Sequence, residues 1–194
     1  MILDFACSDT KKFFISGHSE RFHSIEGLAL RKLDLLQCAC SPRDLQNKAS
    51  SQALDGAAGS ISVGEGWHIF FSWAGNSVRG VRLAQKQLQI KTPASLPAEN
   101  AVRIVSHPGA ILREEFMIPL GLSSNQVSIA ISVPVSRMLD IVNERRGISS
   151  DTASRLSRYL GISARLWTSL QSEYELSVIR QDKRDLLDKI KAYA

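Results

Sequence analysis

The chain of 194 residues has no long apolar run, few aromatic residues and only three cysteines. None of its hydrophobic stretches approaches the ~18 residues that a membrane span requires. Its amino terminus, MILDFACSDTKKFF, lacks the basic, apolar and small-residue order of a signal peptide. From these absences we expect a cytoplasmic protein with no membrane partner.

Motifs that bind small ligands are scarce as well. Cys7, Cys38 and Cys40 follow no zinc-ligand spacing, so we interpret them as small, partly buried apolar residues. The sequence has no glycine loop that cradles phosphate and no nucleophile elbow. His18 and His23 flank a loop between two predicted helices and suggest no specific role. We therefore expect neither a metal nor a cofactor.

The chain carries only a mild excess of positive charge. The formal net charge is +5 and the sequence pI is about 9.3, which is compatible with nucleic-acid binding without requiring it. Residues 1–100 contain 11 basic and 9 acidic side chains, and residues 101–194 contain 13 and 10. Because neither part is a basic arm, contact with DNA would depend on a local arrangement of charges.

Residues 86–104 separate two regions of different character. This segment begins KQLQIKTPASLPAEN, with two prolines and few large apolar groups, which is typical of a linker. We predict two domains: a small α+β unit over residues 1–85, with an antiparallel sheet and two helices, and an all-α bundle over residues 105–194.

The first domain combines helical and strand-like patterns. Leucines and isoleucines at helical spacing predict helices over residues 9–17 and 23–40. Short stretches rich in β-branched and aromatic residues, separated by glycine-bearing turns, predict an antiparallel meander. Together with an opening strand, the predicted strands are Ile2–Ala6, Ser60–Val63, Trp67–Trp73 and Val78–Leu83.

The second domain has helix-start and helix-stop signals throughout. His107-Pro108-Gly109 opens one helix, since proline suits a first turn. The predicted helices that follow are 125–131, 134–143, one from the cap Ser149 to the stop residue Gly161, one capped by Ser163, and a charged helix at the carboxy terminus.

Two of these helices, 125–131 and 134–143, are short and joined by a tight turn, which are the proportions of a helix-turn-helix. Their apolar residues can seat both helices on a common core. The outer face of the second helix would then enter the major groove, where arginine reads guanine and serine reaches a base or a phosphate. The residues that this arrangement places on DNA are Pro134, Val135, Ser136, Arg137 and Asp140.

Three further polar residues lie where the phosphate backbone would run. Arg145 and Arg146 follow the second helix, and Gln126 lies near the start of the first. Phosphate contacts of this kind position a protein on DNA without reading its sequence. A plain helical bundle with a solvated arginine pair is an alternative interpretation of the same spacing.

Residues 105–176 resemble the HigA (VapI-like) antitoxins of the lambda-repressor-like helix-turn-helix class. The resemblance is continuous and includes SHPGAILREEF and VPVSRMLDIVNERRGISSDTASRLSRYLGISARLWTSLQSEYEL. It implies that the recognition helix begins at Val133-Pro134 and that the helices around Trp167 and beyond form a homodimer. A palindromic DNA operator would follow from the two-fold symmetry of such a dimer.

Ser132 and Glu144 stand at two positions where members of that family usually have glycine. Glycine adopts a left-handed backbone conformation freely, whereas another residue there costs about 1 kcal/mol. Glu144 also places a negative charge beside the expected DNA surface. We therefore expect these departures to lower the affinity for DNA.

Residues 1–85 resemble the HigB toxins, RelE-like ribonucleases that cut messenger RNA on the ribosome. The resemblance rests on MILDFACSDTKKFFISG, SPRDL and GWHIFFSW. It implies a natural fusion in which a toxin-like domain contacts an antitoxin domain of the same chain.

The catalytic residues of the toxin family are largely missing. Cutting RNA requires a base, an acid and a cation near the phosphate. The family's Leu-His element reads SQALDGA here, its strand arginine is His68, and its terminal Asp-Tyr-His stretch reads VRLAQKQ. His68, Arg79, Arg82 and Lys86 could contact RNA, and His68 is the only candidate acid or base. A lone histidine on a strand is more often structural.

Three functions are consistent with these features. The first is a dimeric, non-enzymatic repressor of its own promoter, with an inactive toxin-like domain as a protein-contact module. The second is a ribosome-dependent mRNA endonuclease held inactive by its tethered antitoxin, at a high effective concentration of inhibitor. The third is an interaction protein that has lost both activities. We favour the first, because the recognition segment is intact and the catalytic set is not.

Overall fold

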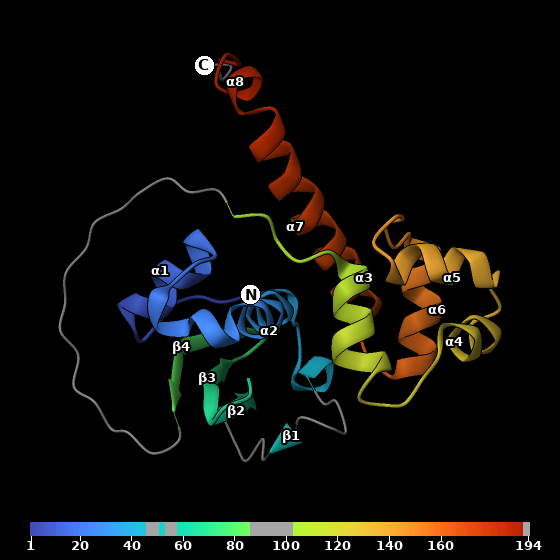
Figure 1. Ribbon diagram of the computed structural model, residues 1–194, viewed down its shortest axis with the longest axis horizontal. Coiled ribbons are helices and arrows are strands. Elements are labelled where there is room, and N and C mark those ends of the chain that lie inside the picture. The colour runs from blue at the N-terminus through green and yellow to red at the C-terminus, as the bar shows by residue number, and fades with distance from the viewer. Residues whose placement is uncertain (46–50, 53–57, 86–102, 192–194) are drawn as a thin grey trace.

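The computed structural model describes residues 1–45, 51–52, 58–85 and 103–191. Within these residues, an amino-terminal α+β part and a carboxy-terminal helical part lie side by side (Figure 1). Most of the predicted linker, residues 86–102, lies outside the described residues.

A small antiparallel sheet forms the amino-terminal part, with the strand order β1-β2-β3-β4. The predicted meander is confirmed, and β1 is a strand that the sequence did not predict. The predicted opening strand, Ile2–Ala6, does not form as a strand: the chain there runs parallel to β4 through two isolated bridges, from Ile2 to Val78 and from Phe5 to Val81. The strands are β1 (Ser51–Gln52), β2 (Ala58–Ser62), β3 (Trp67–Ala74) and β4 (Ser77–Gln85).

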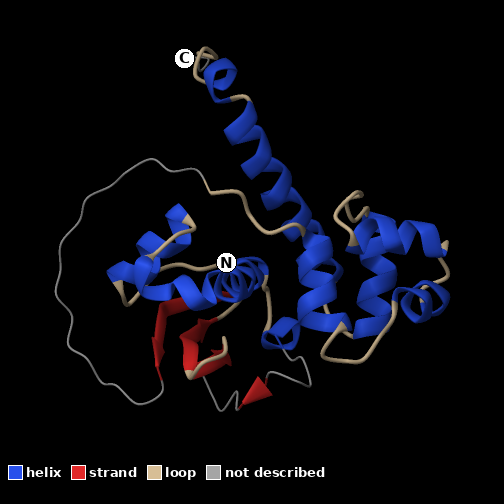
Figure 2. Ribbon diagram, in the orientation of Figure 1, coloured by secondary structure: helices blue, strands red, loops and turns tan. Residues whose placement is uncertain are grey.

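Helices cover one face of this sheet, as Figure 2 shows by colour. The predicted helix over 23–40 begins later than expected, because a separate 3-10 helix precedes it. Phe13, Phe22 and Leu33 are fully buried beneath these helices. Ile69 on β3 meets them from the sheet, since alternate residues of a strand point to opposite faces. The segments are α1 (Ser8–Ser16), η1 (Glu20–Ile25), α2 (Glu26–Cys38) and η2 (Pro42–Leu45).

The carboxy-terminal part contains each helix that the sequence predicts up to α7. Trp167 lies fully buried at its centre, with its ring edge-on to Phe116 at a centroid separation of 5.2 Å. The segments are α3 (Pro108–Ile111), the π-helix η3 (Leu112–Met117), α4 (Ser124–Ala130), α5 (Val135–Val142), α6 (Ser150–Leu160), α7 (Ala164–Asp182) and α8 (Arg184–Leu187).

The end of the chain differs from the single charged helix that the sequence predicts. Helix α7 projects away from the body toward the carboxy terminus (Figure 1). It ends at Asp182, and between Lys183, at φ −119°, and residue 191, where the described residues end, the chain forms only the four-residue α8. No residue of α8 is buried. A short helix without tertiary packing is marginal in water, which explains the break.

Buried charges join the two parts at a contact that we call the seam, defined by Lys32, Asp34, Arg103 and Glu115. Lys32 Nζ lies 2.6 Å from Glu115 Oε2, and their side chains are 7% and 5% exposed. The Arg103 guanidinium donates hydrogen bonds of 3.1 and 2.5 Å to the two carboxylate oxygens of Asp34. Buried charges are tolerated when they are paired and hydrogen-bonded, so these contacts specify how the two parts meet.

Asp44 of η2 provides another tie between the parts. Its Oδ1 accepts a 2.9 Å hydrogen bond from the backbone N–H of Ser163, the residue that caps α7. Its Oδ2 accepts from the N–H groups of Cys40 and Ser41 at 2.9 and 3.1 Å. A carboxylate at the amino terminus of a helix also meets the positive end of the helix dipole.

Among the described helices, none combines the length and hydropathy that crossing a bilayer requires.

Candidate DNA-binding surface

Helix α4 begins with a capping box that uses a predicted phosphate-contacting residue. Ser123 Oγ accepts a hydrogen bond from the N–H of Gln126 at 3.2 Å, and Gln126 Oε1 accepts from the N–H of Ser123 at 2.8 Å. The amide oxygen of Gln126 is thus used by the cap. Its amide nitrogen is the atom that would donate to a phosphate, a contact that stays a prediction.

The turn between α4 and α5 is a Schellman motif with serine at its left-handed position. Ser132 has φ 54°, its N–H bonds to the carbonyl of Ile129, and the N–H of Val133 bonds back to Ser128. Glycine is the usual residue at this position, because it has no Cβ to strain. The sequence comparison of Ser132 with glycine therefore identified a genuine left-handed site.

Arg155 of α6 holds this turn from beneath, a role that the sequence analysis missed. Its Nη1 donates to the carbonyl of Ile131 at 3.1 Å and to that of Ser132 at 3.4 Å. Its Nε bonds to Asp151 at 2.9 Å, one helical turn away. The spacing of Asp151 and Arg155 by four residues is a signal for the ion pair but not for the turn contact, which requires the fold.

Helix α5 is seated by a close backbone contact as well as by apolar side chains. Met138 and Ile141 are fully buried on its inner face. Gly109 of α3 lies against it so closely that a Cβ at this position would be 1.8 Å from the carbonyl oxygen of Ile141. Only glycine permits this approach, so the contact at Gly109 sets the distance between α3 and α5.

The outer face of α5 brings the predicted base-reading residues together. Pro134, Val135 and Ser136 are exposed at the helix start. Arg137 and Asp140 follow on the same helix, with side chains 38% and 37% exposed. A helix start that is exposed and rigidly seated is what entry into a major groove requires. Base contacts by these five residues stay a prediction.

The arginines of this surface are loosely held by carboxylates. Arg137 Nη1 lies 3.9 Å from Asp151 Oδ2, and Arg145 Nη2 lies 3.2 Å from Asp140 Oδ1. The Arg145 side chain is 65% exposed, and Arg146 is exposed beside it. Exposed ion pairs of this kind contribute little stability, so a DNA phosphate or base can replace the carboxylate at small cost.

Helix α5 ends in a second Schellman motif, with Glu144 at its left-handed position. Glu144 has φ 63°, its N–H bonds to Ile141, and the N–H of Arg145 bonds to the carbonyl of Asp140 at 2.8 Å. Arg113 of η3 donates to the carbonyl of Val142 and lies 3.5 Å from Glu144 Oε1. The carboxylate of Glu144 therefore lies at the end of α5 that is predicted to contact phosphate.

Leu139 is an exposed apolar residue that the sequence analysis did not include in this surface. It is 42% exposed, and Val135, four residues earlier on the same side of α5, is 38% exposed. Apolar side chains on a recognition helix can contact a thymine methyl group. The four-residue spacing from Val135 is the signal that could have identified Leu139.

His107 caps α3 behind the surface. Its Nδ1 accepts a 3.0 Å hydrogen bond from the N–H of Gly109, and its ring lies edge-on to Tyr174 at 4.7 Å. Burial lowers the pKa of His107 from its ordinary value of 6.5, and the Glu144 carboxylate acts in the opposite direction. A neutral ring is required for Nδ1 to accept, so the cap and the pKa direction agree.

The candidate catalytic residue of the amino-terminal part lies elsewhere. His68 is half-buried on β3, and its ring is 5.9 Å from that of Phe70. The Arg82 guanidinium lies over the Phe70 ring at 5.3 Å. Arg79 is exposed on β4, whereas Lys86 lies outside the described residues. This group is separate from the α5 surface, and its role in RNA contact stays a prediction.

Comparisons with known proteins match about half of the chain. No family model matches it. Virulence-associated protein I of Dichelobacter nodosus is 45% identical over 92 residues, which are 47% of this chain and 85% of that protein. Virulence-associated protein A of the same organism is 33% identical over 86 residues, 44% of this chain and 84% of that protein.

A solved structure described as the Pseudomonas aeruginosa antitoxin HigA with the higBA promoter is 39% identical, with a TM-score of 0.43, and the match covers 46% of this chain and 98% of that one. Through about half of its length, this chain belongs to the HigA/VapI-like family of helix-turn-helix antitoxins. Because each of these matches covers less than half of the chain, the resemblance of residues 1–85 to HigB stays a proposal.

Proposed function

We propose that this protein is a sequence-specific repressor of the antitoxin type that binds its own promoter. The observation that carries the proposal is the outer face of α5, where Ser136 and Arg137 project from a helix whose other face is fully buried. Membership of the HigA/VapI-like family supports the same function. A DNA-binding role is also consistent with the cytoplasmic location that the sequence predicts.

Binding would exchange internal ion pairs for contacts with DNA. Arg137 would leave Asp151 and donate two hydrogen bonds to a guanine, while Ser136 reaches a neighbouring base or phosphate. Arg145 would leave Asp140 for the phosphate backbone, joined by Arg146 and by the amide nitrogen of Gln126. Asp140 is then free to accept from a cytosine amino group.

We infer further that the protein acts as a homodimer on a palindromic operator. Leu176 and Ile179, three residues apart on α7, are 42% and 40% exposed and form an apolar stripe that a second copy could cover. A two-fold axis would set two α5 helices about 34 Å apart, in successive major grooves. Light scattering of the purified protein measures its oligomeric state; a monomer at all concentrations contradicts the inference.

The decisive experiment is a salt-titrated mobility shift on the upstream DNA of the gene. Arg137→Ala should weaken specific binding by at least about tenfold, as expected for loss of one bidentate base contact. Arg184→Ala is the matched control, because Arg184 lies on α8 at the far end of α7 (Figure 1). A folded wild-type protein that shows no preference for its upstream DNA would overturn the proposal.

We propose that the amino-terminal part is an inactive toxin-like domain. The support is chemical: of the positions that match the toxin family's catalytic residues, His68 alone carries a candidate acid or base, and it is half-buried within a strand. The arrangement of His68, Phe70 and Arg82 on one sheet favours the second candidate function, a ribonuclease restrained by its antitoxin part. Incubation of the full chain and of Glu115→Ala, which weakens the seam, with translating ribosomes distinguishes the two. Cleaved mRNA in either sample supports the ribonuclease.

A further inference from the structure

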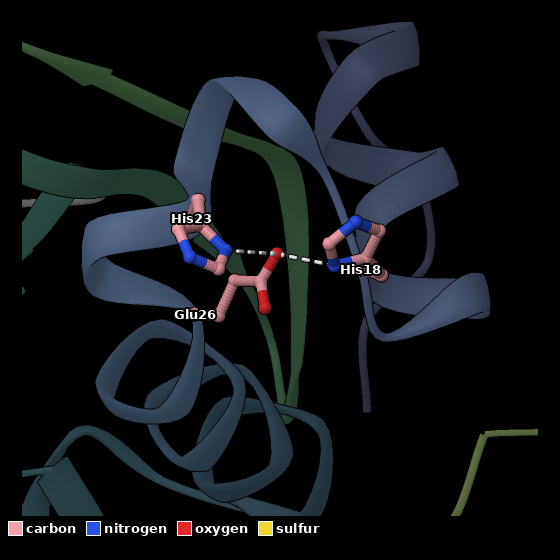
Figure 3. Close-up of side chains that lie close together, drawn as sticks. All are labelled: His18, His23 and Glu26. Atoms are coloured by element: carbon pink, nitrogen blue, oxygen red, sulfur yellow. Dashed lines mark ion pairs between the residues drawn. The ribbon is translucent and has the colours of Figure 1, made fainter.

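Two histidines and a glutamate meet on the surface of the amino-terminal part (Figure 3). His18 Nδ1 lies 2.8 Å from Glu26 Oε1, and His23 Nδ1 lies 3.9 Å from the same oxygen. One potential ligand atom from each of the three residues lies within 4.8 Å of the other two. Side chains from a loop, from η1 and from the first residue of α2 therefore converge on one point.

The backbone of this turn is ordered by its own hydrogen bonds. Gly17 ends α1 in the left-handed region, at φ 78°. Ser16 Oγ then accepts from the N–H of His18 at 3.3 Å and donates to its carbonyl at 2.9 Å. Glu26 Oε1 accepts from the N–H of Ser19 at 2.9 Å. His23 and Glu26 are three residues apart and lie on the same side of the helical segment. The side chains of His18, His23 and Glu26 therefore lie close together without a bound ligand.

We propose that His18, His23 and Glu26 form a binding site for a divalent transition-metal ion, with zinc as the best match. Two imidazole nitrogens and one carboxylate are a recurrent zinc ligand set, with water or an external group in the fourth position. With zinc–ligand bonds of about 2.0–2.1 Å, neighbouring ligand atoms of a tetrahedron lie roughly 3.3 Å apart. The distances of 2.8 and 3.9 Å bracket that value.

Ion pairing alone does not account for this arrangement. The His18 and His23 side chains are 66% and 79% exposed, so neither ring is required by the core. An exposed histidine–carboxylate pair contributes little stability, and one histidine would be enough to make it. Because both rings are exposed, rotation about their side-chain bonds can bring the nitrogens to metal-binding distances. Magnesium and calcium prefer oxygen ligands and fit the site poorly.

The cysteines are the natural competitors for zinc, and none of them is among the ligand atoms that converge at this site. Burial raises the pKa of the Cys38 thiol to about 12, which disfavours the thiolate that metals bind. Cys7 and Cys40 are half-buried free cysteines, and their replacement by serine removes them from a binding measurement. Cys40 has a contact of its own, to the carbonyl of Cys38.

A bound metal would act on the fold close to the seam. The same turn packs against Arg103, since a Cβ at Gly17 would lie 2.8 Å from Arg103 Cδ. Metal that binds the folded chain alone adds stability that rises with metal concentration. Zinc at His18, His23 and Glu26 would therefore stabilise the end of α1 and the start of α2, beside the contact between Gly17 and Arg103.

The test uses the full chain with Cys7→Ser and Cys40→Ser, titrated with ZnCl₂ in equilibrium dialysis and in thermal unfolding. We expect one zinc ion per chain and a higher Tm in the presence of zinc. His18→Ala and His23→Ala should each weaken binding by at least about tenfold, since even the loss of a residue that only supports a ligand costs 10–100-fold. His68→Ala, which removes a histidine on β3, is the matched control and should bind like the parent.

Glu26→Gln keeps the acceptor for the Ser19 N–H while removing the charged ligand, and it should also weaken zinc binding. Circular dichroism of each variant tests that the substitutions leave the fold intact. Zinc binding that is absent, or that is equal in the parent, His18→Ala and His23→Ala, would overturn the proposal. Equal binding of magnesium would overturn it as well, because the site would then be an unselective anionic patch.

Discussion

Arginines and lysine pair with carboxylates in two regions of this protein, the seam and the α5 surface, with opposite consequences. At the seam, Lys32 and Glu115 are almost fully buried and 2.6 Å apart. On the α5 surface, Arg137 and Asp151 are 3.9 Å apart and exposed. Burial makes the first pair necessary to the fold, because a lone charge could not be hydrated, whereas water screens the second pair and leaves its arginine available for DNA.

The strongest test of this contrast breaks the buried pair on one side. Glu115→Ala should destabilise the protein by about 3–5 kcal/mol, because Lys32 is left buried without a partner. The double variant Lys32→Met/Glu115→Leu should recover the part of that loss that comes from Lys32, while Arg31, whose Nε lies 3.6 Å from Glu115 Oε1, still loses its carboxylate. Urea unfolding followed by circular dichroism measures both. If Glu115→Ala lowers the free energy of unfolding no more than Asp151→Ala does, the distinction between the two regions is wrong.

A second test moves α5 without touching a charge. Gly109→Ala places a Cβ against the carbonyl oxygen of Ile141, so α3 and α5 must separate. Overpacking of this kind costs about 1–3 kcal/mol and displaces the backbone. We expect a lower free energy of unfolding together with weaker operator binding. Ala110→Gly, a change at the neighbouring half-buried position, is the control; DNA binding that is as strong in Gly109→Ala as in wild type contradicts the packing argument.

A third test concerns the left-handed end of α5. Glu144→Gly should stabilise the protein by about 1 kcal/mol, because Glu144 has φ 63° and glycine removes the strain. It should also raise the affinity for DNA by removing a negative charge near the phosphates. Glu144→Gln separates these effects, since it removes the charge and keeps the strain. Equal DNA affinity for wild type and Glu144→Gln would show that the charge does not act on DNA.

The smallest expected effect is a dependence of stability on pH through His107. Burial lowers the pKa of His107 in the folded state below its ordinary value of 6.5, so the unfolded chain binds the proton more readily. Its contribution to stability is complete above pH 6.5 and is lost as the pH falls through the lower folded pKa. His107→Asn, which keeps an acceptor for the Gly109 N–H, should flatten the unfolding free energy between pH 7 and 5 relative to wild type. An identical pH profile for both proteins would contradict this assignment.

Much of the site could be predicted because it depends on local signals. Ser149 and Ser163 cap the helices that they were expected to cap, and Gly161 ends α6 in the left-handed region. The departures at Ser132 and Glu144 were visible as missing glycines, and both residues have positive φ. Caps and left-handed stops involve residues within a few positions of one another, so a sequence records them directly.

Contacts between residues far apart in the chain could not be predicted from such local signals. Arg155 and Arg113 were not singled out, although they hold the turn and the end of α5 through the carbonyls of Ile131 and Val142. His18 and His23 were given no role, because their convergence on Glu26 depends on a left-handed turn and a 3-10 helix between α1 and α2. A sequence shows which donors exist, but not which acceptors the fold brings to them.

The sequence by itself determined the helices of the carboxy-terminal part before the end of α7, the strands β2, β3 and β4, and the side chains available for contact with DNA, because period, capping and glycine placement act over a few residues. The tertiary structure alone decided which charges are buried and which are exposed. Lys32 and Glu115 are 83 positions apart, and nothing local distinguishes them from the charged residues of α8, none of which is buried. Desolvation depends on everything that packs around a group, so the role of each charge was fixed only when the two parts met.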